Sequence, residues 1–148
     1  MLAIPRAMQQ FQTQIEIQTR GAGLYEFTRE IQRFVFMSGV ETGLLTAFCR
    51  HTSASLIIQE NADPDVRSDL VGFFRRVAPE GMEWISHRTE GPDDMPAHIK
   101  AALTQTSIGI PVSNGLPVLG TWQGLYLFEH RTQPHKREVV MHLVGAVK

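Results

Sequence analysis

The chain has 148 residues, with 14 Lys and Arg against 15 Asp and Glu and a formal net charge of -1. This length fits one domain that buries roughly two-thirds of the surface its unfolded chain exposes, so neither disulfides nor a metal is required for folding. The balanced charge excludes a general electrostatic attraction to nucleic acid or to an anionic membrane.

Neither a targeting signal nor a membrane span is expected. The stretch MLAIPRAMQQF lacks a basic segment followed by an apolar run of signal-peptide length. No apolar run reaches the roughly 18 residues that a membrane span requires. The single cysteine, Cys49, has no partner for an internal disulfide and lies in the apolar run LLTAFC. We therefore expect a cytoplasmic protein with no membrane partner.

The first part of the chain predicts one strand and one helix. Residues 11–19 alternate apolar or Thr side chains with polar ones, which is the period of a strand with one buried face. Residues 25–36 place Phe27, Ile31, Phe34 and Val35 on one helical face, so a helix is expected there.

The middle of the chain predicts strands followed by two helices. The apolar run GLLTAFCRHTSASLII is broken by RHTS, which indicates two strand pieces or one strand with a bulge. A helix follows, with Asp63 as N-cap and Pro64 in its first position. The stretch EGPDDMPAHIKAAL predicts another helix, with Asp94 as N-cap and Pro96 in its first turn.

The last third predicts short strands separated by Asn-Gly, Gly and Pro turn signals. We expect an antiparallel meander there, ending in a strand over residues 137–144. Because no repeat, linker or low-complexity tract interrupts the chain, residues 1–148 are expected to form one α+β domain. Its core would be a largely antiparallel sheet or sandwich, with a few helices.

A candidate site surrounds the start of the EGPDDMPAHIKAAL helix. His98 stands one helical turn after Asp94, where a carboxylate can hold the imidazole in one tautomer and aim its other nitrogen outward. His87 and Glu90 precede a Gly-Pro turn and can fold back over the helix start. The alternative is that the acids only cap the helix and complement its dipole, while His98 is an ordinary surface histidine.

Three other positions have a functional and a structural interpretation. His51 ends an apolar strand and is followed by two hydroxyl residues, which suits either a ligand site or a plain strand-end turn. Arg131 lies in a basic turn that can bind phosphate through two parallel donors or simply be solvated. Trp122, between glycines, is either a pocket wall or a packed turn residue. The spacing matches no established zinc motif and no nucleophile elbow.

Four stretches together resemble the YjbQ family: HTSASLIIQENADP, HRTEGPDDMPAHIKAAL, IPVSNGLPVLGTWQGLYLFEHR and VVMHLVG. The similarity runs in order from about residue 11 to the C-terminus. It implies a single α+β domain that assembles as a homotrimer with sites near the subunit boundaries. Where the family pattern has Asn at the start of Asn-Glu-Asn-Ala-Asp-Pro, this chain has Gln59, which puts only the local turn in doubt.

The resemblance also implies a chemistry. Family members are described as secondary thiamine-phosphate synthases, which join a pyrimidine diphosphate to a thiazole phosphate and release pyrophosphate. The resemblance further implies that His51, His87 and His98 converge on a polar, metal-binding pocket. Three neutral imidazoles favour zinc or a similar ion, whereas magnesium would better suit a reaction that releases pyrophosphate.

These considerations assign roles to specific residues. The residues expected to take part in catalysis are Glu90, Asp94 and Arg131. Those expected to bind a small phosphorylated substrate are Thr52, Ser53, Asn61, Trp122, His130 and Arg131. Two alternatives to the synthase remain: a metal-dependent phosphate or ester hydrolase with Glu90 or Asp94 as general base, and a non-catalytic trimer that binds a metal or an anion.

Overall fold

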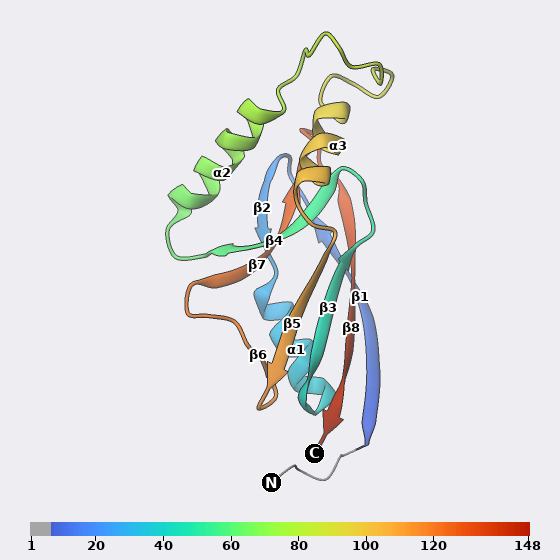
Figure 1. The fold of residues 1–148 in the computed structure, drawn as a ribbon, viewed down its shortest axis with the longest axis vertical. Coiled ribbons are helices and arrows are strands. Elements are labelled where there is room, and N and C mark those ends of the chain that lie inside the picture. The colour runs from blue at the N-terminus through green and yellow to red at the C-terminus, as the bar shows by residue number, and fades with distance from the viewer. Residues whose placement is uncertain (1–6) are drawn as a thin grey trace.

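The computed structural model describes residues 7–148; the first six residues of the predicted 1–148 domain lie outside this range. It contains a five-stranded sheet with strand order β1-β8-β3-β5-β6 and a three-stranded sheet with order β2-β7-β4, both antiparallel, and three helices (Figure 1). The α+β prediction is thereby confirmed. The elements are β1 (Met8–Gln18), β2 (Gly23–Glu26), α1 (Thr28–Ser38), β3 (Val40–Cys49), β4 (Ala54–Glu60), α2 (Pro64–Val77), α3 (Asp94–Leu103), β5 (Ser107–Ser113), β6 (Leu116–Pro117), β7 (Gln123–Glu129) and β8 (Lys136–Val147).

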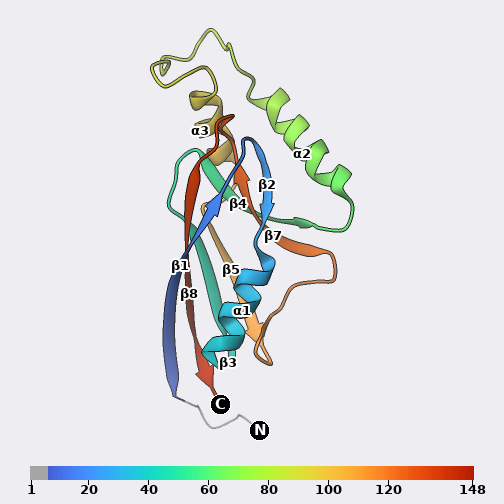
Figure 2. The same ribbon diagram turned by 180° about the vertical axis from the view of Figure 1, so that it is seen from behind.

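The apolar core lies between α1 and the two sheets. Ile31 and Val35 of α1 are fully buried together with Leu45 of β3, Leu127 of β7 and Leu143 of β8. Figure 2 shows α1 lying across one face of the larger sheet, at the end where the chain finishes. Helix α3 stands at the opposite end of the molecule (Figure 1).

The first helix begins later than the sequence predicts. Residues 25–26 belong to β2, which pairs with β7, and α1 begins at Thr28. The hydroxyl of Tyr25 donates to the carbonyl of Gly21 at 2.8 Å and accepts from the amide of Arg20 at 2.8 Å. These bonds hold the turn before β2 and keep Tyr25 out of the helix. The expected helical face is still buried at Phe27, Ile31 and Val35.

The run GLLTAFCRHTSASLII forms two strands that belong to different sheets. Strand β3 pairs with β5 and β8, whereas β4 pairs with β7. The predicted C-terminal meander is wrong beyond the β5–β6 hairpin, whose Asn114-Gly115 turn has φ of 53° and 77°. Strand β7 crosses to the smaller sheet, and β8 returns between β1 and β3. Turn signals fix where strands end but not which strands pair.

Helix α2 has the predicted cap but no buried face. Asp63 accepts a hydrogen bond from the amide of Asp65 at 2.9 Å, and Pro64 opens the helix. None of its residues is buried, and Phe73 and Val77 are 57% and 45% exposed. Figure 1 shows the helix standing away from the larger sheet. Its apolar stripe is therefore largely uncovered in the single chain.

A buried ion pair fixes the end of β7. Glu129 is fully buried and accepts hydrogen bonds from Nε of Arg137 at 2.8 Å, from Nη2 of Arg137, and from Oγ1 of Thr19 at 2.7 Å. Because Thr19 follows β1 and Arg137 lies in β8, this network joins both sheets. The network fixes the end of β7 at Glu129, and Arg131 follows two residues later. No helix within residues 7–148 combines the length and the apolar character needed to cross a membrane.

Candidate metal centre at the start of α3

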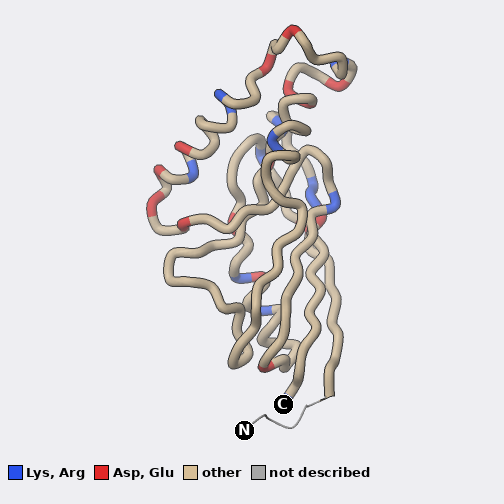
Figure 3. Tube along the Cα trace, in the orientation of Figure 1, with Lys and Arg blue, Asp and Glu red and all other residues tan. Residues whose placement is uncertain are grey.

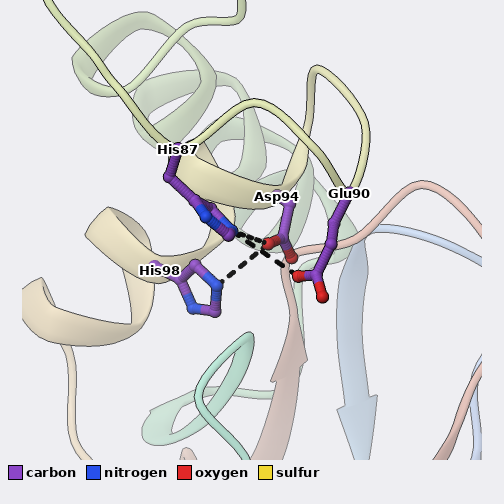
Figure 4. A group of neighbouring side chains, drawn as sticks. All are labelled: His87, Glu90, Asp94 and His98. Atoms are coloured by element: carbon purple, nitrogen blue, oxygen red, sulfur yellow. Dashed lines mark hydrogen bonds and ion pairs between the residues drawn. The ribbon is translucent and has the colours of Figure 1, made fainter.

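Four potential metal-ligating side chains meet at the start of α3. His87 and Glu90 come from the loop before the helix, Asp94 is its first residue, and His98 stands one turn later. One ligand atom from each lies within 4.8 Å of the others. Figure 4 shows the four side chains pointing toward a common centre. The loop folds back as expected, with Gly91 at φ 102° making the turn.

Asp94 is the centre of this group rather than the helix cap. Asp93 precedes the first helical residue, and neither acid makes a side-chain capping bond. The side chain of Asp94 is only 3% exposed, and its Oδ2 lies 2.6 Å from Nε2 of His87 and 3.0 Å from Nε2 of His98. Oδ1 accepts from Nη1 of Arg131 at 2.6 Å. The predicted N-cap role of Asp94 is therefore wrong, because its oxygens are turned to the histidines and the guanidinium.

The tautomer of His98 follows from its other nitrogen. Nδ1 of His98 lies 2.8 Å from the backbone carbonyl of Thr52, which can only accept, so Nδ1 carries a hydrogen. In neutral His98, Nε2 is then a lone pair that faces the carboxylate of Asp94 at 3.0 Å. Two acceptors repel at that distance unless a cation lies between them, and either a proton or a metal ion meets this need.

The donor set fits a divalent transition ion. Two imidazole nitrogens and two carboxylates are ligands that zinc accepts, whereas magnesium prefers oxygen ligands alone. A tetrahedral zinc ion separates its ligand atoms by roughly 3.3 Å. The separations of 2.6 and 3.0 Å from Asp94 to the histidines, and of 3.5 Å from His87 to Glu90, bracket that value.

Arg131 holds two adjacent carboxylates in place. Its Nε donates to Oδ2 of Asp93 at 3.0 Å, its Nη1 donates to Asp94, and its Nη2 donates to the backbone carbonyl of Glu90 at 2.9 Å. Asp93 Oδ2 also accepts from the amide and hydroxyl of Thr132 at 2.9 and 3.1 Å. All three nitrogens of the guanidinium are thus engaged, so Arg131 positions the site.

These contacts set the charge of both acids. Burial raises the pKa of Asp93, but the bonds from Arg131 and Thr132 outweigh it and bring the pKa to about 2. Burial likewise raises the pKa of Asp94, while hydrogen bonds with His87 and Glu90 and the charges of His98 and Arg131 hold it below its usual range. Both side chains are therefore carboxylates at neutral pH.

The loop between β3 and β4 carries three residues predicted for the site, His51, Thr52 and Ser53, which differ in their contacts. Nε2 of His51 accepts from the amide of Glu138 at 2.7 Å, so this nitrogen faces β8, and His51 is not among the four clustered residues. Burial, followed by the charge of Arg137, lowers the pKa of His51. Thr52 contributes its backbone carbonyl to His98, and the hydroxyl of Ser53 accepts from Arg137 at 3.0 Å.

Asn61 and Trp122 lie at the other end of β4. Ser53 precedes this seven-residue strand and Asn61 follows it, which separates them by roughly 25 Å. The amide of Asn61 donates to the carbonyl of Trp122 at 3.0 Å, and its side chain donates to Glu26 at 3.3 Å. Trp122 is 61% exposed. The structure does not bring these two residues to the group around Asp94.

His130 is buried behind the site, with Nε2 2.9 Å from Oγ of Ser55 and its ring against Phe128. Burial, with smaller effects from the charges of Lys100 and Arg137, lowers its pKa to about 3, so it is neutral at neutral pH. Asp93 and Thr132 were not assigned to the site from the sequence. The sequence signal that could have indicated Asp93 is the pair of neighbouring acids, Asp93 and Asp94, together with Arg131 later in the chain.

Comparison with known proteins identifies relatives of the whole chain. The family model described as UPF0047 protein YjbQ-like matches residues 13–146. A UPF0047 protein of Synechocystis sp. is 54% identical over 99% of this chain and 100% of its own length. The UPF0047 protein YjbQ of Escherichia coli O157:H7 is 40% identical over 91% and 98%, respectively. A crystal structure of a YjbQ/UPF0047 family protein from Clostridium acetobutylicum, 35% identical, has a TM-score of 0.81 over 88% of this chain and 98% of that chain.

Proposed function

This chain belongs to the YjbQ-like UPF0047 family, and we propose that it binds one divalent transition ion and hydrolyses a small phosphorylated substrate. The observation that carries the proposal is the relation between Thr52, His98 and Asp94. The backbone carbonyl of Thr52 takes the Nδ1 hydrogen of His98, so Nε2 faces Asp94 across 3.0 Å. This arrangement favours a cation between them. Zinc, or an ion of similar preference, suits the two imidazoles and the carboxylate of Asp94 as three ligands, with one position left open and Glu90 beside it.

The four side chains differ in what they offer to a reaction. The side chain of Asp94 is 3% exposed and held by Arg131, which suits a fixed ligand. The side chain of Glu90 is 64% exposed, and its Oε2 lies 3.5 Å from Nε2 of His87. An exposed carboxylate at the edge of the group can accept a proton from an attacking water, so we assign Glu90 as general base. A divalent ion held there supplies a Lewis acid that polarises a phosphoryl oxygen and acidifies water.

The synthase reaction implied by the family resemblance is the second candidate. It also needs a cation to stabilise departing pyrophosphate, and the group around Asp94 would serve that purpose. The role predicted for Arg131 as a phosphate ligand finds less support, and the nearby Arg137 is no freer to bind phosphate. The guanidinium of Arg131 is engaged by Asp93, Asp94 and Glu90, and that of Arg137 by Glu129.

We further propose a homotrimer, in line with the resemblance. Large apolar side chains are exposed on several elements, and a surface of this kind is typical of association between chains. They include Phe36, Met37, Leu44, Phe48, Phe73 and Val77. Light scattering of the purified chain measures the mass directly. A monomer at micromolar concentration would overturn the assembly proposal and leave the metal site untouched.

Two measurements test the main proposal. The first is the metal content of wild type beside His51→Ala, His87→Ala and His98→Ala. We expect zinc in the wild type and its loss in His87→Ala and His98→Ala, while His51→Ala reveals whether His51 is the third imidazole ligand predicted from the resemblance. A wild type without bound metal, after growth and purification with zinc, would overturn the proposal.

The second measurement separates the reactions. Pyrimidine diphosphate is incubated with zinc-loaded protein, with and without thiazole phosphate. Hydrolysis releases phosphate or pyrophosphate in the absence of thiazole phosphate, whereas the synthase forms thiamine phosphate only when both are present. We expect Glu90→Gln to reduce hydrolysis strongly. If that variant remains as active as the wild type, Glu90 is not the general base.

A further inference from the structure

A second cavity, separate from the group around Asp94, lies on another face of α3. It has a volume of about 440 Å³ and lies between α3, the end of α2 and the chain that follows β7. Helix α3 contributes Pro96 and Lys100 to its wall, whereas the ligand group uses Asp94 and His98. Successive residues of a helix are separated by about 100°, so these two pairs point in nearly opposite directions. We propose that this cavity is a binding site for a small phosphomonoester.

Two cationic side chains line the cavity. Arg75 of α2 and Lys100 of α3 both contribute to its wall. Within residues 7–148, neither side chain forms a hydrogen bond or an ion pair. Glu80 and Asp93 line the same cavity and act on Lys100 through their charge, but neither forms an ion pair with it, so a bound anion would supply the direct partner that both cations lack.

The floor of the cavity supplies a buried donor. His130 lines the cavity, is 2% exposed, and has no hydrogen-bond partner for Nδ1 among the described residues. Oγ of Ser55 accepts from Oγ1 of Thr104 at 2.6 Å and can donate its own hydrogen to Nε2 of His130 at 2.9 Å. With the hydrogens arranged in this way, neutral His130 carries its own hydrogen on Nδ1; a bond from the hydroxyl of Thr104 to the carbonyl of Lys100, 2.9 Å away, would instead place it on Nε2. A buried N–H without an acceptor is unfavourable, so an acceptor in the cavity would favour the form of His130 that carries its hydrogen on Nδ1.

Two acids, Asp93 and Glu80, line the cavity, but neither accepts a hydrogen bond from Nδ1 of His130. Asp93 already accepts from Arg131 and Thr132 through Oδ2, and Glu80 is an exposed residue at the end of α2. Figure 3 shows acidic and basic residues gathered around α2, α3 and their connecting loop, while the far end of the sheets carries few. An anion would therefore meet both cations and the donor of His130 without displacing an existing pair.

The apolar part of the wall indicates a ligand larger than inorganic phosphate. Alanine and proline side chains complete the cavity, at Ala22, Ala78, Pro79 and Pro96. Its volume lies within the range of roughly 300–1,000 Å³ found for small-molecule sites. A phosphate bound by Arg75 and Lys100, with a compact organic group against the alanines and prolines, fits both parts of the wall. Arg offers two parallel donors to a phosphate, and Lys offers a point charge.

Calorimetric titration of the full chain with inorganic phosphate tests the site, first after metal has been removed by chelation and then after loading with zinc. Saturable binding of equal affinity in both forms is expected, because the cavity does not use the metal ligands. Lys100→Gln and Arg75→Gln should each weaken binding at least about tenfold, equivalent to about 1.4 kcal/mol. Arg76→Gln is the matched control: it removes the same charge from the next residue of α2, which lies outside the cavity wall.

A spectroscopic measurement on the wild type avoids reliance on variants. Phosphate should shift the ring ¹⁵N resonances of His130 and leave those of His87 and His98 in place. Absence of saturable binding would overturn the proposal, as would equal binding by wild type, Lys100→Gln and Arg75→Gln. Binding that requires zinc, or that shifts His87 and His98, would also overturn it, because phosphate would then be a ligand of the metal.

Discussion

His98 and Asp94 stand one turn apart on α3, with Nε2 of the imidazole 3.0 Å from Oδ2 of the carboxylate. The backbone carbonyl of Thr52 accepts the hydrogen of the other ring nitrogen, Nδ1, at 2.8 Å. The lone pair on Nε2 of neutral His98 is therefore directed at a negative oxygen. A metal ion removes that conflict, and protonation of the ring removes it in the absence of metal. Proton and metal thus compete for one position.

Replacing Asp94 by Asn should therefore remove metal binding while retaining most of the fold. The amide has the shape of the carboxylate, and its NH₂ can donate to Nε2 of His98, which leaves no place for a cation. We expect zinc affinity to fall more than the roughly 10–100-fold typical when an outer partner is lost. Titration with a zinc indicator measures the loss. His142→Gln, at a half-buried histidine bonded to Gln10 and Gln12, should bind zinc like the wild type.

Removal of zinc should also lower the melting temperature. At a free zinc concentration about 100 times Kd, binding stabilises the native chain by about 2.7 kcal/mol, which corresponds to roughly 5–11 °C for a domain of this size. Calorimetry with and without chelator measures the difference. Asp94→Asn should melt at the same temperature in both conditions; a zinc-dependent increase in this variant would place the ion elsewhere.

Arg131→Lys tests whether the guanidinium positions the ligands. Arg131 reaches Asp93 through Nε and Asp94 through Nη1 at the same time, with its side chain 18% exposed. A lysine ammonium keeps the charge but cannot reproduce this fork. We expect zinc affinity to decrease by about 10–100-fold, as for other outer partners of metal ligands. Arg50→Lys, at an exposed pair with Glu138, should change neither zinc affinity nor stability. Unchanged zinc affinity in Arg131→Lys would show that Asp94 is held by the backbone alone.

Asp93 predicts a pH dependence of stability that is separate from the metal. Its pKa is about 2 in the folded chain against 3.8 in the unfolded reference, and its side chain is 12% exposed. A carboxyl whose pKa is depressed by folding stabilises the native state above the unfolded pKa, by about 2 kcal/mol here. That contribution is lost as pH falls from 3.8 toward 2.

Asp93→Asn should accordingly unfold more easily than the wild type at pH 7, and the difference should shrink below pH 4. Urea unfolding of both proteins in chelator, from about pH 2 to pH 7, measures it. Asp65→Asn, an exposed acid in the first turn of α2, provides the comparison. A constant difference between wild type and Asp93→Asn across this range would contradict the assigned role of the carboxylate.

The sequence predicted much of the fold from local signals. The alternation in β1, the Asp63 cap of α2 and the Asn114-Gly115 turn each depend on neighbouring residues, and each was found. Pairing of β7 with β4 and of β8 with β3 depends on contacts between distant residues, which no local period encodes.

In the candidate site, too, the local arrangement was predictable from the sequence and the contacts between distant residues were not. His87, Glu90, Asp94 and His98 lie within twelve residues of one another, and the turn and helix spacing that join them could be deduced. The carbonyl of Thr52 and the guanidinium of Arg131 come from other elements. Arg131 was expected to bind phosphate because its sequence neighbours are basic, whereas its neighbours in space are acidic. The apolar stripe of α2 is not buried within the chain, and periodicity alone cannot assign such a stripe to the core or to another chain.

Gly145→Ala tests the close approach of β8 and β3. Gly145 pairs with Gly43, and a Cβ added at Gly145 would lie 2.8 Å from the Cα of Gly43 and also meet the carbonyl oxygen of Thr42. These are backbone atoms, so relief requires the strands to separate. We expect a loss of at least about 1–3 kcal/mol in unfolding free energy, as for other overpacked positions. In Gly109→Ala the nearest atom is a leucine side-chain carbon at 3.6 Å, so urea unfolding should show little loss there. Equal stability of the two variants would mean that β3 and β8 can move apart without a loss of stability. The register of β8 against β3 would then not depend on Gly43 and Gly145.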